Sequence, residues 1–261
     1  MNREAQAAVL LLTGVALLHA GLSDLYLRYV KAGLQPLLLA AGAVLVVAAL
    51  ATVWYELRLP RRGDPGQEDG RREDAWQENE REDGHDAGDP HPHPHPHREP
   101  VVAWLLVLPL VALVLVAPPA LGSYSAARSG TSVPRPFGFP ALPAGDPLRM
   151  ETADYAGRAV HDHGRSLTGR RITLTGFVSV ARDGTPYLTR MVLNCCAADA
   201  RPVKIGMTGQ VPPVLQPDAW LEVTGTYTPR RAEDPVNDGP VPFLDVSRAR
   251  PVRAPTEPYE G

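Results

Sequence analysis

The stretch RRITLTGFVSV at residues 170–180 gives the clearest indication of the fold. In it, Ile172, Leu174 and Gly176 alternate with threonines, which is the period-two pattern of a half-buried β-strand. The threonine-glycine step that ends this alternation is typical of a bend or bulge in a strand. The stretch therefore predicts a strand from a small, strongly curved sheet.

Four more strand-like stretches follow in the C-terminal half, at residues 186–194, 202–208, 219–227 and 243–248. Gly, Pro and Asp occupy the gaps between them, as in the turns that join short strands. The sequence METADYA just before the first strand has helical character. Short strands at this spacing favour an all-β domain over residues 148–261, a small barrel resembling the OB-fold, with a sandwich fragment as the alternative.

The loop after the second of these strands, LNCCAADARP at residues 193–202, contains the only two cysteines of the chain. A trans peptide holds the Cα atoms of neighbouring residues about 3.8 Å apart. This is below the usual 4.4–6.8 Å of a disulfide, so a bond between Cys195 and Cys196 is disfavoured. Asp199 is expected to help form the turn.

Three interpretations of these vicinal cysteines remain open. The first is a site for a thiophilic transition metal such as zinc, formed by Cys195 and Cys196 with Asp199, His161 and His163. The two histidines would lie on one side of the chain if their segment were extended, although an exposed loop pair is equally consistent. The second interpretation is an exchangeable disulfide with a partner protein, and the third is two small core side chains without chemistry.

Three apolar runs lie outside the predicted β domain, at residues 5–22, 34–57 and 101–117. Spanning a bilayer takes about 20 apolar residues, with a range of roughly 17 to 25, so the second run passes easily and the first and third pass at the short end. A secretory signal peptide is the alternative for the first run. We expect residues 1–57 to form a two-helix membrane hairpin and residues 101–117 a third transmembrane helix.

The loop at residues 58–100 is strongly charged and nearly free of aliphatic side chains, which predicts disorder. It ends in a His-rich tract with His91, His93, His95 and His97. Alternating proline favours an extended polyproline conformation, in which successive histidines point in different directions. The tract has two interpretations, a weak binding site for a transition metal and a plain solvated linker.

Arginines are concentrated in the 58–100 loop, which predicts a cytoplasmic location for this loop and for the N-terminus. Arg28 and Lys31, in the turn between the first two runs, argue mildly for the opposite orientation. Three crossings of the cell membrane would leave the β domain outside the cytoplasm. Residues 118–147, rich in Pro, Gly and Ser, would be its tether.

Several functional motifs are absent from the sequence. It has no Gly-rich phosphate loop, no G-x-S-x-G elbow, no H-E-x-x-H and no paired C-x-x-C, so we do not expect an enzyme. The predicted strands carry few aromatic residues and no basic stripe, so nucleic acid is not an expected partner.

Three stretches together resemble a family. They are YLRYVKAGLQPLLLAAG at 26–42, GRRITLTGFV at 169–178 and YLTRMVLNCCAADARPVKIG at 187–206, and they are similar to the YcgQ-like bacterial membrane proteins known as permease subunits. The resemblance covers the membrane helices and the β domain, with the cysteine stretch, including Ala198, as its most specific part. It implies an accessory subunit that pairs with a multi-spanning permease in the lipid bilayer. The alternatives are a scaffold or assembly factor that docks a partner protein, and a thiol-dependent redox protein.

Overall fold

A computed structural model describes residues 3–58, 116 and 119–261 of the chain. Of these, residues 16–41, 116 and 119–261 belong to one compact unit, and residues 3–15 and 42–58 to a second. Apart from their end residues Arg58 and Val116, the predicted 58–100 loop and the predicted 101–117 helix lie outside the described residues. The same is true of the four histidines of the His-rich tract, His91, His93, His95 and His97.

The first two apolar runs form helices, α1 (Arg3–Leu22) and α2 (Gln35–Arg58). Gly14 and Gly21 of α1 mark close approaches between them. A Cβ atom on Gly14 would lie 2.8 Å from the Val46 side chain, and one on Gly21 would lie 2.8 Å from Leu39. Small residues at such positions let two helix backbones pack closely, as is common among membrane helices.

Across residues 3–58, 116 and 119–261, one helical segment is long and apolar enough to cross a membrane, Ala32–Tyr55. The apolar part of α1, Gln6–Leu22, is shorter than the 18 residues expected of a membrane-spanning helix. The described residues thus support one N-terminal apolar helix, whose composition fits either a membrane span or a signal sequence, and the prediction of three transmembrane helices is not confirmed.

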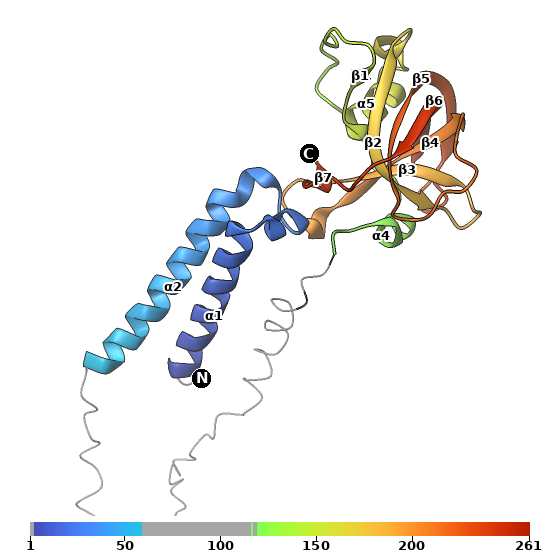
Figure 1. Cartoon of the computed structure of the whole chain (residues 1–261). Coiled ribbons are helices and arrows are strands. Elements are labelled where there is room, and N and C mark those ends of the chain that lie inside the picture. The colour runs from blue at the N-terminus through green and yellow to red at the C-terminus, as the bar shows by residue number, and fades with distance from the viewer. Residues whose placement is uncertain (1–2, 59–115, 117–118) are drawn as a thin grey trace, which may run out of the picture. The chain divides into compact units, whose positions relative to one another are not determined.

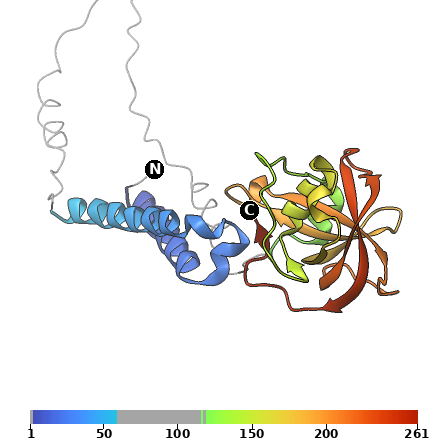
Figure 2. The same ribbon diagram turned by 90° about the horizontal axis from the view of Figure 1, so that it is seen from above.

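The C-terminal region is a five-stranded β-barrel, consistent with an OB-like fold. Figures 1 and 2 show its strands from two directions. Neighbours around the barrel pair in the order β2–β3–β4–β6–β5 and back to β2, and β4–β6 is its parallel pair. The strands are β2 (Arg171–Val180), β3 (Pro186–Val192), β4 (Arg201–Gly209), β5 (Trp220–Glu233) and β6 (Pro240–Pro251).

All five predicted strands are present, and three of them, β4, β5 and β6, are longer than predicted. Strands β5 and β6 pair along almost their whole length, with register shifts at Thr224/Gly225 and Thr228/Arg231. Two short strands extend the sheet: β1 (Leu148–Arg149) pairs in parallel with β2, and β7 (Tyr259–Glu260) pairs in parallel with β3.

Helix α5 (Thr152–His161) packs on the main core of the barrel. Tyr155 is fully buried there, and its hydroxyl donates a hydrogen bond to the Phe243 carbonyl oxygen at 2.6 Å. The strands contribute mostly β-branched and leucine side chains that point inward at every second position. The buried strand residues of this core are Ile172, Leu174, Val178, Leu188, Val203, Ile205, Leu221, Val223, Leu244 and Val246.

The structure differs from the predicted 118–147 tether. Helix α4 (Ser123–Arg128) packs on the barrel with Ala126 fully buried. Its N-terminal residue Ser123 donates hydrogen bonds to Asp218 from both its amide and its hydroxyl, at 2.6 and 2.7 Å. A composition rich in Pro and Gly therefore does not keep this segment off the domain, because a small apolar side chain and polar anchors hold it in place.

Candidate functional site

The loop that carries the two cysteines lies between β3 and β4, where the sequence predicts it. It contains a short 3-10 helix, Ala197–Asp199. The Asp199 carboxylate accepts hydrogen bonds from the amides of Asn194 at 3.1 Å and Cys195 at 2.9 Å. Asp199 is thus the turn-forming residue of this loop, as predicted.

The two thiols are free and close together. The sulfur atoms lie 3.7 Å apart, with Cys195 exposed and Cys196 half-buried. The interpretation of two buried core side chains is therefore wrong. The Cys195 thiol also donates a hydrogen bond to Oδ2 of Asp199 at 3.1 Å.

The hydrogen bond to Asp199 has a chemical consequence. Together with the bond to Cys196, it raises the pKa of the Cys195 thiol to about 11. The same bond lowers the pKa of the Asp199 carboxyl. Because the thiolate is the nucleophile in thiol chemistry, this setting disfavours the reactive form of Cys195 at neutral pH.

The sulfur spacing is suited to a soft metal. Two thiolates on a tetrahedral zinc ion, each about 2.3 Å from it, lie about 3.8 Å apart, close to the observed 3.7 Å. Nevertheless, over residues 3–58 and 119–261 no group of three or more His, Cys, Asp or Glu side chains is arranged to hold a metal ion. The structure thus offers two sulfurs beside one carboxylate, and a metal there would need further ligands from outside the loop. Metal binding stays a prediction.

The histidines of the predicted site lie elsewhere. His161 is the last residue of α5 and His163 has a left-handed φ of 52°, so their segment is not extended. Both line a hollow of about 390 Å³ together with Arg135, Pro136, Phe139 and Val160. The structure therefore groups His161 and His163 with Arg135 and groups the two cysteines with Asp199.

The cysteine loop makes an unpredicted contact with the turn between α1 and α2. Cys196 forms an antiparallel β-bridge with Val30. The Ala197 amide donates to the Tyr29 carbonyl oxygen at 2.7 Å, and the Lys31 amide donates to the Cys195 carbonyl oxygen at 3.1 Å. The main chain of the turn thus pairs with the cysteine loop like a short additional strand.

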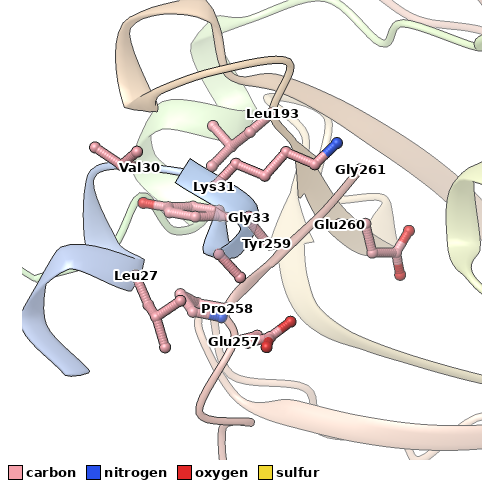
Figure 3. Close-up of a pocket in the computed structure, with 11 residues that line it drawn as sticks. Leu27, Val30, Lys31, Gly33, Leu193, Glu257, Pro258, Tyr259, Glu260 and Gly261 are labelled. Atoms are coloured by element: carbon pink, nitrogen blue, oxygen red, sulfur yellow. The ribbon is translucent and has the colours of Figure 1, made fainter. Parts of the chain in front are cut away.

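Tyr259 of β7 strengthens this contact. Its hydroxyl donates to the Arg28 carbonyl oxygen at 3.0 Å and accepts from the Leu121 amide at 2.8 Å. In Figure 3 the ring extends from the C-terminal segment toward the turn. One side chain thus joins three segments that are far apart in the sequence.

A pocket of about 160 Å³ lies beside the contact (Figure 3). It is small compared with the roughly 300–1,000 Å³ of typical ligand pockets. We therefore regard it as a gap between the two segments and not as a ligand site. Its lining residues are Leu27, Val30, Lys31, Ala32, Gly33, Leu193, Glu257, Pro258, Tyr259, Glu260 and Gly261.

The sequence does not predict this contact, because it joins residues more than one hundred positions apart. One signal was present: Tyr29 and Val30 are residues of high strand propensity in a short turn between two helices.

Comparisons with known proteins agree with the description of the C-terminal region as a domain. Searches of curated proteins and of solved structures found no match. Residues 144–260 match the family model described as the DUF1980 C-terminal domain, so the β domain is similar to an uncharacterised family.

Proposed function

We propose that this protein is an accessory subunit of a membrane permease, of the YcgQ-like kind, whose β domain lies outside the cytoplasm. The observation that carries the proposal is the pairing of residues 29–31 with the cysteine loop. Residues 29–31 lead directly into the apolar segment Ala32–Tyr55. A contact at this position connects an apolar helix to the domain, as a subunit that transmits a signal to a membrane partner requires.

The surface of α2 supports a membrane location and a helical partner. Leu37, Val44 and Val47 are each about two-thirds exposed. Only 11% of the most apolar 18-residue stretch of Ala32–Tyr55 is buried. Apolar surface of this extent is normally covered by lipid or by other helices. The helices of a multi-spanning permease would provide such a cover.

The cysteine loop is the proposed ligand site of the subunit. Its sulfur spacing suits a thiophilic metal such as zinc, and a partner would supply the ligands that this chain lacks. The proposed role of Cys195, Cys196 and Asp199 is binding and not catalysis, because the raised pKa of Cys195 disfavours a thiolate in the absence of a metal.

Co-purification from native membranes tests the proposal. The tagged full-length chain is extracted in mild detergent, and the associated proteins and bound metals are measured. We expect a multi-spanning membrane protein in a fixed ratio to the chain, and a metal that is lost in the Cys195→Ser/Cys196→Ser variant. A monomer without metal or membrane partner would refute the proposal.

A tryptophan scan of α2 sharpens the test, because Trp keeps the helix apolar but disturbs helix packing. At about 100° per residue, Leu37 and Val44 share one face, and Val53 lies on the opposite face. If the partner packs on the first face, Leu37→Trp/Val44→Trp loses it and Val53→Trp retains it. Equal retention in all variants would contradict a partner on the face of Leu37 and Val44.

A further inference from the structure

A row of polar side chains crosses four strands on the outer face of the barrel. Arg149 of β1 lies opposite Thr173 of β2, Thr173 lies opposite Thr224 of β5, and Thr224 lies opposite Arg248 of β6. Directly paired residues share a face of the sheet. The strand register therefore places two threonines between two arginines, although these arginines are about one hundred positions apart in the sequence.

A second row beside it fixes two guanidinium groups. Glu222 of β5 lies opposite Arg250 of β6. Its carboxylate pairs with Arg149 at 2.9 Å and with Arg250 at 2.6 Å, and the Glu222 side chain is only 12% exposed. Burial alone would raise the pKa of Glu222, but the hydrogen bonds and charges of the two arginines outweigh it, and the pKa is lowered. A charged, half-buried carboxylate thus holds the two guanidiniums in place.

These residues surround a hollow of about 310 Å³. It is lined by Pro147, Arg149, Thr173, Glu222, Thr224, Arg248 and Arg250. Three arginines against one carboxylate leave the hollow positively charged. The Arg248 side chain makes no ion pair or hydrogen bond with any other residue that the structure describes.

The floor of the hollow also offers a hydrogen-bond donor. The hydroxyls of Thr173 and Thr224 lie 2.9 Å apart, and either could be the donor. Each hydroxyl has one proton, and their mutual hydrogen bond uses only one of the two. The other proton is free to point toward a ligand.

We propose that this hollow binds a phosphate group. Guanidinium groups match the oxygens of phosphate in charge and in bidentate geometry. Arg248 would provide the unpaired charge, Arg149 and Arg250 would contribute the N–H groups that Glu222 leaves unused, and a threonine hydroxyl would bind a further oxygen. The phosphate could come from solution or from the headgroup of an anionic phospholipid, because both present the same oxygens.

Calorimetry on the full-length chain in phosphatidylcholine nanodiscs tests the proposal. One arm titrates inorganic phosphate, and the other titrates a short-chain phosphatidic acid below its micelle concentration. Arg248→Ala removes the unpaired guanidinium without disturbing Glu222, and Arg182→Ala removes an exposed arginine outside the hollow as the matched control.

We expect Arg248→Ala to weaken binding about tenfold or more, the loss of one charge-assisted contact, and Arg182→Ala to leave it unchanged. Arg248→Lys keeps the charge but not the bidentate geometry, so it should fall between wild type and Arg248→Ala. Binding of phosphate alone assigns a soluble ligand, and preference for phosphatidic acid assigns a lipid headgroup. No saturable binding in either arm, or equal losses in Arg248→Ala and Arg182→Ala, would overturn the proposal.

Discussion

A single substitution can test the contact between the turn and the cysteine loop, by removing one amide hydrogen. Ala197 donates its amide hydrogen to the Tyr29 carbonyl oxygen at 2.7 Å. Ala197→Pro removes this hydrogen and places a ring carbon against that oxygen. The loop itself should tolerate the change, because Ala197 is the first residue of its 3-10 helix and Cys196 is already extended, with φ −152° and ψ 170°.

The expected loss follows from the contacts of the turn. A backbone hydrogen bond contributes about 0.5–1.5 kcal/mol net. The turn makes two such bonds with the loop, from Ala197 and Lys31. If proline separates the two segments, both bonds are lost, which is about 1–3 kcal/mol and corresponds to roughly a 5- to 150-fold rise in the open population.

Hydrogen exchange on the full-length chain in nanodiscs measures this directly. The Lys31 amide, which donates to Cys195, should exchange at least fivefold faster in Ala197→Pro. Ala197→Ser retains the amide hydrogen and should exchange like the wild type. Unchanged protection of Lys31 in the proline variant, with the barrel core still protected, would refute the paired contact.

Three further predictions concern the β domain. Asp199→Asn weakens the hydrogen bond that raises the Cys195 pKa and also removes the nearby negative charge, so the pKa should fall from about 11 toward its ordinary 9.0. The rate of alkylation of Cys195 at pH 8 should then rise by roughly one to two orders of magnitude. Asp234→Ala leaves the buried ammonium of Lys204, now 2.7 Å from that carboxylate, without its counter-ion, and denaturant unfolding should show a loss of about 3–5 kcal/mol. Tyr259→Phe removes two hydrogen bonds, so the midpoint of thermal unfolding should fall by several degrees, corresponding to about 1–3 kcal/mol.

The strands could be predicted because their signal is local. In β2 the alternation of Ile172 and Leu174 with threonine directly reflects the two faces of a strand. The second half of β5 was missed because TPRRAE is polar and mostly exposed, so no alternation marks it. It forms a strand because it pairs with β6. Local strand propensity does not predict such a non-local pairing.

The candidate sites were harder to predict because they depend on register and on long-range pairing. The sequence predicted the position of the cysteine loop between two strands. It did not predict that His161 and His163 lie away from the cysteines, because their position depends on where α5 ends and how the chain turns after it. It also contained no visible basic stripe, because Arg149 and Arg248 become neighbours of one hollow only through the pairings β1–β2, β2–β5 and β5–β6.

The cysteine loop uses its main chain and its side chains for different purposes. The Cys195 carbonyl and the Ala197 amide bind the turn, while the Cys195 sulfur remains exposed. A metal bound by the two sulfurs would therefore contact the same loop whose main chain pairs with the turn. It could favour the paired state only if it binds that state more tightly than the open one, and pairing would then raise the affinity for the metal by the same factor. For this reason Ala197→Pro, which changes no sulfur atom, should alter the affinity of the cysteine pair for zinc if binding and pairing are coupled, and should leave it unchanged if the turn is only an anchor.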